Sequence, residues 1–225
     1  MLVNYFRASL KTTPITAVLV AICTGIWIFS ALWSTSLSNT GANPLAQAWM
    51  LNPESLAYST GWKHWWPLLG HTFIHLDVQH LGLNMIFLWL FGRELEAFLG
   101  SRYFAVAYFI CGLGGAAGVL FLEQGSWTGG ASGCLYGLMA IFIFVARQRS
   151  RDLRAPIVLI LANLVFSFIT PGISLGGHLG GFLAGLCVGA TLLLKNSQLR
   201  AWLLLAVGAG CVAAIYAALA LVYFQ

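Results

Sequence analysis

The sequence predicts an all-α membrane protein, a polytopic bundle of transmembrane helices. Of its 225 residues, 60% are hydrophobic and only 8% are charged. Soluble globular domains carry about 25% charged residues, so most of this chain must face lipid. Apolar runs of about 20 residues, the length that crosses a bilayer as a helix, also recur along the whole chain. A protein with this composition is expected to be embedded in the membrane.

Seven apolar runs follow one another, and we interpret each as one span. They are residues 14 to 34, 80 to 99, 103 to 123, 132 to 146, 155 to 170, 178 to 194 and 201 to 224. The first run is too long for the apolar part of a cleaved signal peptide, so it is interpreted as a retained signal anchor. We expect three parts and no soluble domain: a cytoplasmic segment 1–13, a six-helix core 14–194 and an additional helix 201–225.

The basic residues predict the orientation of the spans, because Lys and Arg accumulate in short cytoplasmic loops. With the N-terminus inside, ten of the eleven basic residues are cytoplasmic and Lys63 alone lies outside. The ten are Arg7, Lys11, Arg93, Arg102, Arg147, Arg149, Arg151, Arg154, Lys195 and Arg200. We therefore expect a protein of the cell (plasma or inner) membrane with its C-terminus outside. The net charge of +5 is an orientation signal and does not indicate nucleic-acid binding.

The five cysteines do not indicate a chemical site. All of them fall within predicted spans and none is in a CxxC spacing. They are Cys23, Cys111, Cys134, Cys187 and Cys211. Cysteines of this kind are expected to be small apolar fillers, and no metal or cofactor is predicted from them.

One connection, residues 35–79, is much longer than the others and lies on the outer side. It contains four tryptophans, Trp49, Trp62, Trp65 and Trp66, and few charges. Tryptophans of this kind favour the headgroup zone, so the segment is predicted to be interfacial. An aromatic belt anchor is the simpler explanation for each Trp alone. A 45-residue connection in a compact bundle nevertheless indicates a function.

The fourth span is too short to cross the membrane from its cytoplasmic anchor. Ser132 is 15 residues from Arg147, or roughly 22 Å at 1.5 Å per residue, against an apolar thickness of about 30 Å. The N-terminus of this helix must therefore end below the outer surface. Free backbone amides at that depth are costly unless they line a wet cavity.

Other polar side chains are predicted at the same depth. His178 is 17 residues from Lys195, and His80 is 16 residues from Glu96, which gives roughly 24 to 25 Å in both spans. Asn84 follows His80 by four residues and so shares its helix face. Three helices thus bring a Ser, a His and a His–Asn pair to one layer.

Glycine spacing suggests how two of these helices meet. Gly133 and Gly137 in the fourth span, and Gly181, Gly185 and Gly189 in the sixth, recur at intervals of four residues. Small residues at this interval let membrane helices approach closely. If the two faces oppose each other, Ser132 and His178 lie at the mouth of the contact. Tyr136, one turn below Ser132, could then pack on the imidazole.

These parts suit nucleophilic catalysis. A serine hydroxyl is activated when a neighbouring base takes its proton, and neutral His is the usual base near pH 7. The developing oxyanion needs donors, and the helix start at Gly130 to Gly133 offers amides and the positive end of the dipole. Asn84 and His80 could add side-chain donors. Asp77 and Glu123 lie on the correct side, so a triad stays open, but a Ser-His dyad fits better.

Four stretches of the chain, GASGCLYG (130–137), GHLGGFLAG (177–185), HTFIHLDVQHLGLN (71–84) and GRELEAFLGS (92–101), together resemble the rhomboid family of intramembrane serine proteases. GASGCLYG (130–137) matches the family's GxSGxxxG, and GHLGGFLAG (177–185) contains its HxxGxxxG. HTFIHLDVQHLGLN (71–84) provides the spaced histidines that end in HxxxN. GRELEAFLGS (92–101) matches GxxxExxxGS. The four motifs cover roughly residues 60 to 190, and their occurrence together in this order is specific.

The resemblance implies a role for each site residue. Ser132 would be the nucleophile and His178 the base, with His80, Asn84 and the Ser132 amide as the oxyanion hole. The supporting residues would be Tyr136, Gly130, Gly133, Gly181, His71 and His75. The family implies a serine endopeptidase without metal or cofactor. Its partners are membrane lipid and single-span membrane proteins, which it cuts in or near the bilayer.

The outer connection departs from the family pattern, and the seventh span agrees with part of the family. Many bacterial members carry Trp-Arg in the outer connection, where this chain has Trp66 and Pro67, so the local loop contacts are expected to differ. The seventh span resembles the layout of six core helices plus one C-terminal helix found in part of the family.

Simpler interpretations exist for each candidate residue. Ser132 could be a helix N-cap. The three histidines His71, His75 and His80 could be satisfied interior side chains or a metal cluster, although no carboxylate or thiolate is clearly beside them. We interpret His71 and His75 as supports of the outer loop and cavity. An ionisable residue within the membrane is a functional candidate by default, which favours an active His178.

Two other functions use similar features. A transporter would also have buried polar residues and broken helices, but the two halves of this sequence show no clear repeat. A catalytically inactive relative would bind transmembrane helices and would usually lack the Ser or the His. This chain has both.

Overall fold

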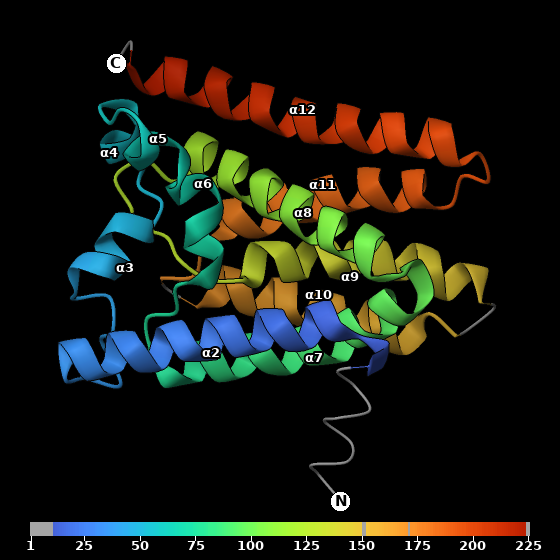
Figure 1. The fold of residues 1–225 in the computed structure, drawn as a ribbon, viewed down its shortest axis with the longest axis horizontal. Coiled ribbons are helices and arrows are strands. Elements are labelled where there is room, and N and C mark those ends of the chain that lie inside the picture. Colours follow the sequence, from blue (N-terminus) through green and yellow to red (C-terminus); the bar gives the residue numbers. More distant parts are fainter. Residues whose placement is uncertain (1–10, 150–151, 171, 224–225) are drawn as a thin grey trace, which may run out of the picture.

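The computed structural model describes residues 11–149, 152–170 and 172–223 and shows an all-α membrane helix bundle (Figure 1). Arg7 and Arg151 and residues 1–10 of the expected N-terminal segment lie outside the described residues. Seven long helices run roughly along one axis (Figure 1). They are α2 (Pro14–Ser34), α7 (Val78–Leu99), α8 (Ser101–Leu122), α9 (Ser132–Gln148), α10 (Arg154–Ile169), α11 (Leu175–Leu192) and α12 (Ser197–Tyr223).

Four of these helices are long and apolar enough to cross a membrane, namely α2, α8, α11 and α12. The protein is therefore an integral membrane protein with several apolar spans. α9 and α10 are apolar but shorter, with 17 and 16 residues. α7 has 22 residues but carries ionisable groups at both ends, among them His80 and Glu96. Of the seven expected spans, four therefore have the length and composition needed to cross a membrane, and the other three are the helices α7, α9 and α10.

The outer connection 35–79 is folded into short helices at one end of the bundle (Figure 1). Their bounds are α3 (Pro44–Trp49), α4 (Pro53–Ala57), α5 (Trp62–Trp65), α6 (Pro67–Gly70) and the 3-10 helix η1 (His71–Phe73). Proline at the first position and an asparagine cap start both α3 and α4, where Asn43 accepts from Ala46 N–H and Asn52 from Ser55 N–H.

Pro67 has a clear place in this region. It opens α6, its carbonyl accepts from the ring of His71 at 2.8 Å, and the preceding Trp66 packs edge-on against Trp49 with ring centroids 4.8 Å apart. The dipeptide that departs from the family pattern is therefore part of the turn leading to the histidines, with Pro67 buried and Trp66 exposed.

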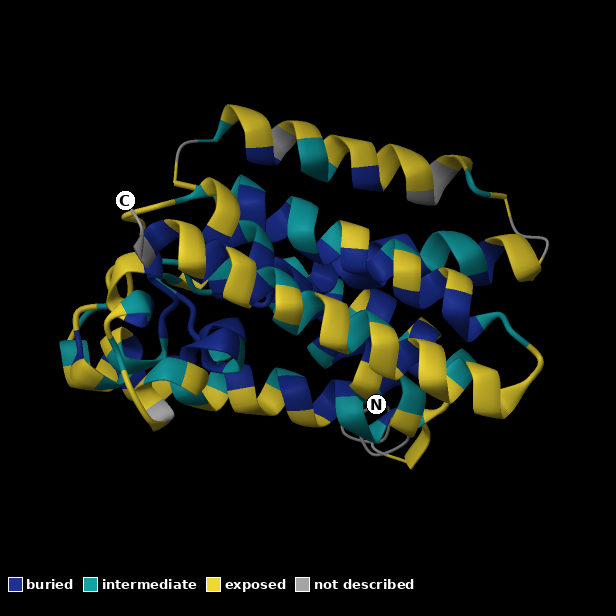
Figure 2. Cartoon of the chain, turned by 90° about the horizontal axis from the view of Figure 1, so that it is seen from above, coloured by how far each residue is buried: buried dark blue, intermediate teal, exposed yellow. Residues whose placement is uncertain are grey.

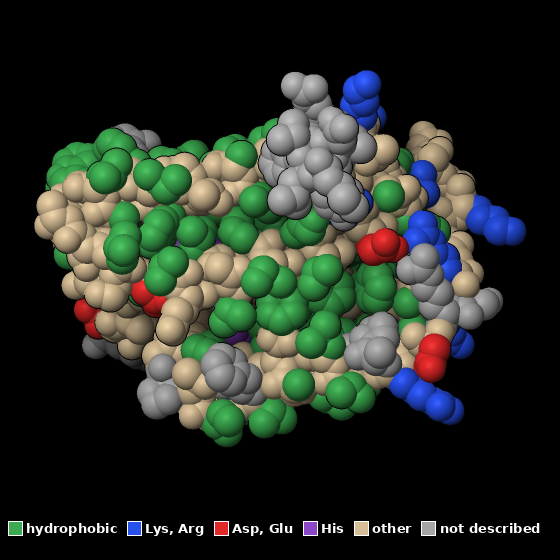
Figure 3. Space-filling view, turned by 90° about the horizontal axis from the view of Figure 1, so that it is seen from below, with side chains coloured by type: hydrophobic (Ala, Val, Ile, Leu, Met, Phe, Trp, Pro, Cys, Tyr) green, Lys and Arg blue, Asp and Glu red, His purple; other side chains and the backbone are tan. Residues whose placement is uncertain are grey.

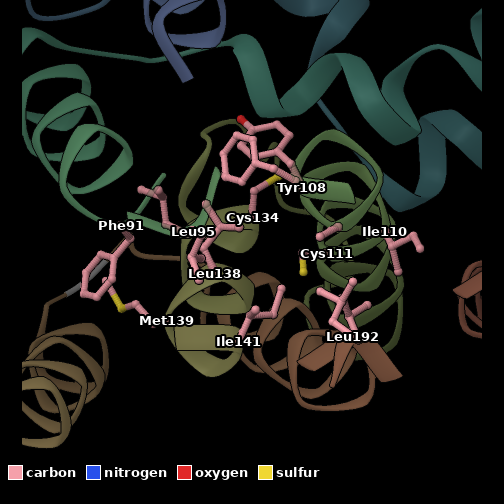
Figure 4. Close-up of a cluster of buried hydrophobic side chains, with 14 of the residues drawn as sticks. Phe91, Leu95, Tyr108, Ile110, Cys111, Cys134, Leu138, Met139, Ile141 and Leu192 are labelled. Atoms are coloured by element: carbon pink, nitrogen blue, oxygen red, sulfur yellow. The ribbon is translucent and has the colours of Figure 1, made fainter. Parts of the chain in front are cut away.

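The core lies between α7, α8, α9 and α11. Phe91, Leu95, Tyr108, Ile110, Cys111, Cys134, Leu138, Met139, Ile141 and Leu192 pack together there (Figure 4). Two cysteines of this cluster are buried and free, as expected for apolar fillers. Buried residues concentrate in these central helices, whereas α10 lies at an edge of the bundle and is mostly exposed (Figure 2).

Glycines let α11 lie in backbone contact with two neighbours. A Cβ on Gly181 or Gly185 would collide with the carbonyls of Gly133 or Gly137 on α9, as the spacing predicted. On its other side, Gly180 meets Gly114 of α8, a contact that the sequence analysis did not anticipate. α11 is therefore held between α8 and α9 by close backbone packing.

A buried carboxylate fixes α2 to α7. Glu96 is 1% exposed and accepts hydrogen bonds from the N–H groups of Ile15 and Thr16 and from the Thr16 hydroxyl, at 2.7 to 2.9 Å. These amides belong to the first turn of α2, where a negative charge also complements the helix dipole. The Ser101 hydroxyl donates to the same carboxylate at 2.6 Å.

Charge is unevenly distributed along the bundle. On the face shown in Figure 3, Lys and Arg side chains gather towards one end of the molecule, and apolar side chains cover much of the remaining length. This end holds the α7–α8 and α9–α10 connections and lies opposite the short helices α3 to α6 (Figure 1). Arg102 lies in the first turn of α8, and Arg149 is the C-cap of α9.

Candidate functional site

A cavity of about 890 Å³ lies among α7, α9, α10 and α11 and the segment before α9. Its polar lining includes Ser132, His178, His80, Asn84, Tyr136 and Ser167. Five of the residues singled out in the sequence thus line one cavity, and Ser167 lines it as well. Apolar side chains, among them Leu83, Phe87 and Met139, line the remainder.

Ser132 is the first residue of α9 and is half-buried. Ala131 occupies the N-cap position, and the described residues show no side-chain cap on this helix. The N-cap interpretation of Ser132 is therefore wrong. The hydroxyl stands at the start of the helix, beside backbone amides that have no acceptor within α9.

His178 lies one turn inside α11 instead of at its start. The helix begins at Leu175, and Ser174 caps it by accepting from the Gly177 N–H. The imidazole is 5% exposed and stacks on the Tyr136 ring, with centroids 4.1 Å apart and an 18° interplanar angle. Its Nδ1 is 2.8 Å from the hydroxyl of Ser167. The nitrogen left to face another group is Nε2.

The glycine contact brings the Ser132 and His178 segments together. A Cβ on Gly133 would be 3.1 Å from the carbonyl oxygen of Gly177, and a Cβ on Gly181 would overlap the carbonyl of Gly133. Gly133 follows Ser132 and Gly177 precedes His178. The two side chains therefore emerge from adjoining backbone segments into the same cavity.

His80 and Asn84 lie on one face of α7 and line the same cavity. Asp77 caps α7 by accepting from the His80 N–H at 2.8 Å. The Asn84 amide donates to the His80 carbonyl at 2.8 Å, which leaves its second N–H for another acceptor.

Gly130 is the residue that allows His80 to approach Ser132. Its φ of +139° is a conformation that residues with side chains rarely adopt. A Cβ at this position would lie 2.7 Å from His80 Nε2 and 3.7 Å from Ser132 Oγ. A side chain on residue 130 would therefore fill the space between the imidazole and the hydroxyl.

His71 and His75 are buried beneath the segment that leads into α9. The His71 carbonyl accepts from the Gly130 N–H at 2.9 Å, and the Ala131 N–H points to His75 Nε2 at 3.5 Å. Burial lowers the pKa of His71 to about 4 and that of His75 to about 3, with the nearby His80 adding to the effect on His75. Both rings are neutral near pH 7 and support the backbone before Ser132.

Metal binding is not indicated by the described residues, where no group of three or more His, Cys, Asp or Glu could hold an ion. The two acids left open as a third catalytic member serve helix N-termini instead. Asp77 caps α7, and Glu123 accepts from the Gly176 N–H at the start of α11. The position beside His178 Nδ1 is taken by Ser167, a residue that the sequence analysis missed.

The sequence is similar to known proteins over more than half of its length. A family model described as Rhomboid domain matches residues 63–195, more than half of the sequence. Rhomboid protease GluP of Bacillus subtilis (strain 168) is 34% identical over 133 residues, which are 57% of this chain and 26% of that protein. RHOMBOID-like protein 4 of Arabidopsis thaliana is 31% identical over 181 residues, 71% of this chain and 43% of the relative.

Rhomboid protease GlpG of Klebsiella pneumoniae is 29% identical over 159 residues, which are 69% of this chain and 51% of that protein. The chain spans about a quarter to a half of the length of these three relatives.

Proposed function

Because the chain belongs to the rhomboid family of intramembrane serine proteases, we propose that it cuts single-span membrane proteins in or near their transmembrane segment. In this proposal Ser132 is the nucleophile and His178 is the general base. The observation that carries it is that both side chains line one cavity and emerge from backbone segments in direct contact.

The reaction follows from the positions of these groups. Nε2 of His178 takes the Ser132 proton as Oγ attacks the substrate carbonyl carbon. The tetrahedral intermediate then collapses as the imidazolium gives that proton to the leaving amine. A water molecule, deprotonated by the same imidazole, hydrolyses the acyl-enzyme and returns Ser132 to its free form.

The oxyanion of the intermediate would be held by three donors. The Ser132 N–H is free at the start of α9, the second Asn84 N–H points to no acceptor within α7, and the His80 imidazole approaches through the space left by Gly130. Donors fixed before the reaction stabilise developing charge without reorganisation. Stacking on Tyr136 holds the orientation of the His178 ring.

Ser167 also contacts His178, yet its surroundings do not suit a nucleophile. It is 5% exposed and sits inside α10, where its own backbone amide is used by the helix. Its hydroxyl donates to the Asn163 carbonyl. Ser132 combines a half-buried hydroxyl with free amides, so the nucleophile is assigned to Ser132.

The apolar part of the cavity suits a transmembrane substrate. Leu83 and Phe87 of α7 and Met139 of α9 line it, so a segment leaving the bilayer would keep apolar contacts while its peptide group meets the polar side chains.

We further propose the orientation and layout expected from the sequence. The N-terminus would be cytoplasmic and the C-terminus outside in a cell membrane, with 14–194 as a six-helix core and 201–225 as the additional helix. The gathering of Lys and Arg at the end opposite α3 to α6 supports this orientation (Figure 3).

The test is labelling of the purified protein in detergent with a fluorophosphonate, followed by mapping of the modified residue and a cleavage assay on a single-span substrate. We expect the label on Ser132, and both labelling and cleavage should be lost in Ser132→Ala and His178→Ala. Ser38→Ala, at an exposed serine that does not line the cavity, is the control and should be labelled like the unmodified protein.

Cleavage by Ser132→Ala at the unmodified rate would overturn the assignment. A label mapped to Ser167 would transfer the nucleophile's role to α10.

A further inference from the structure

The hydroxyl of Ser167 lies at the centre of three hydrogen bonds. Its Oγ is 2.8 Å from Nδ1 of His178, 2.8 Å from the Tyr136 hydroxyl and 2.9 Å from the carbonyl oxygen of Asn163. Ser167 is buried, and the three partners belong to α11, α9 and α10. One side chain on α10 therefore joins both helices that carry the proposed catalytic pair.

The protons in this cluster can be assigned by counting donors and acceptors. A serine hydroxyl has one hydrogen to donate and two lone pairs that accept. A carbonyl oxygen can only accept, so the Ser167 hydrogen goes to Asn163. Both lone pairs must then accept, one from the Tyr136 O–H and one from a hydrogen on His178 Nδ1.

We propose that Ser167 is a positioning residue that holds His178 in the tautomer with Nδ1 protonated, leaving Nε2 unprotonated towards the Ser132 hydroxyl. The inference rests on the proposed function of the same site and deepens it. The pair would thus be supported by a neutral hydroxyl on a third helix instead of by a carboxylate.

The tautomer decides whether the imidazole can act as a base. Neutral His carries one hydrogen, and the hydrogen bond at one ring nitrogen determines which nitrogen bears it. If Nε2 carried the hydrogen, it could not take the proton of Ser132. When Nε2 does take that proton, the Nδ1 hydrogen keeps its acceptor, so the charged imidazolium remains hydrogen-bonded within the buried site.

Other polar groups near the site do not supply this function among the described residues. Asp77 and Glu123 accept from backbone amides at the starts of α7 and α11. Tyr136 meets the face of the imidazole and not its nitrogen atoms. Ser167 is the group that the structure places within hydrogen-bond distance of Nδ1.

The size of the effect can be bounded. In serine proteases of another fold, replacing the buried carboxylate that sets the histidine tautomer lowers kcat by about 10⁴. A neutral hydroxyl stabilises the imidazolium less than a carboxylate does. We therefore expect Ser167→Ala to lower kcat by about 10- to 100-fold, with KM changed by less than about twofold, because the Ser167 hydroxyl is buried and already bonded to three protein partners.

The experiment compares Ser167→Ala with Ser167→Thr, which keeps the hydroxyl, and with Thr191→Val as the matched control. Thr191 on α11 also donates to the carbonyl four residues earlier, Cys187, but does not line the cavity. The full-length proteins are assayed for kcat and KM in detergent, and their histidines are labelled with ¹⁵N to read the tautomer by NMR.

The expected result is a protonated Nδ1 on His178 in the unmodified protein and in Ser167→Thr, with near-normal kcat in both and in Thr191→Val. Ser167→Ala should show both tautomers and the reduced kcat, at an unfolding temperature close to that of Thr191→Val. An unchanged tautomer and a kcat within twofold in Ser167→Ala would overturn the proposal. Failure of the proposed function would be separate, since Ser132→Ala would then remain active.

Discussion

The two helices that flank the cavity beside α9 differ sharply in how they are held. α11 lies against α9 with glycine backbones in contact, and no side chains separate Gly181 from Gly133. α10 packs mainly against α9 and exposes much of its surface, including Leu161 at 53% and Ile169 at 71%. The proposed nucleophile and base belong to the tightly held pair, while Ser167 belongs to the loosely held helix.

This difference indicates a division of tasks. Attack on a peptide bond requires the hydroxyl and imidazole to keep their separation within a fraction of an ångström, which contact between backbones provides. A helix whose outer side chains face lipid can be displaced at a lower free-energy cost, because its displacement exchanges only a few protein contacts for lipid contacts. The following changes test this contrast, from the largest expected effect to the smallest.

Gly181→Leu should cause the largest effect, because its side chain would have to occupy the position of the Gly133 carbonyl. Separation of α9 from α11 would remove the core contacts and part the proposed catalytic pair. We expect a protein that fails to fold or that unfolds at least about 10 °C earlier in detergent, with no detectable cleavage. Thermal unfolding followed by circular dichroism measures the shift. Gly25→Leu, at a glycine with open space around it, is the control.

Acid should destabilise the support of the segment that leads into α9, because the histidines beneath that segment are buried. His71 has a folded-state pKa of about 4 because burial disfavours its charged form, against 6.5 when unfolded. The unfolded chain therefore binds the proton first, so stability is fully present above about pH 6.5 and is lost as the pH falls towards 4. The unfolding temperature measured across this range should fall less steeply in His71→Gln. An equal slope in both proteins would remove His71 as the cause.

The smallest effect is expected on α10. Leu161→Ala removes a side chain that is half exposed, whereas Leu138→Ala on α9 removes one that is fully buried. We expect a change of about 0.5 kcal/mol or less for Leu161 and about 2 to 5 kcal/mol for Leu138. Denaturant titration in detergent micelles provides both values. Comparable losses would show that the two helices are held alike.

Much of this arrangement could be predicted from the sequence because it depends on local spacing. Distances counted from Arg147 and Lys195 placed Ser132 and His178 at similar depth, and both line the same cavity in the structure. The four-residue glycine interval predicted the approach of α9 and α11, which the contacts of Gly133 and Gly181 confirm. The helical rise and period are fixed by the backbone, so such estimates do not depend on the partners of a helix.

The parts that were missed depend on partners distant in sequence. Ser167 is a single hydroxyl in an apolar run, and a serine that bonds back to the carbonyl four residues earlier has the same sequence pattern without any catalytic neighbour. Glu96 reaches the start of α2 across 80 residues. The boundaries of α7 and α11 shifted because Asp77 and Ser174 cap these helices ahead of the apolar residues.

The position of Ser167 has a practical consequence for the choice of solubilising medium. A detergent tail or acyl chain wedged between α10 and its neighbours would pull away the acceptor of His178 Nδ1 without touching Ser132. Preparations in different amphiphiles could then share one fold and one amount of labelled serine and still differ in turnover. Rates measured in micelles should accordingly be compared with rates in bilayers of defined thickness before they are assigned to the protein alone.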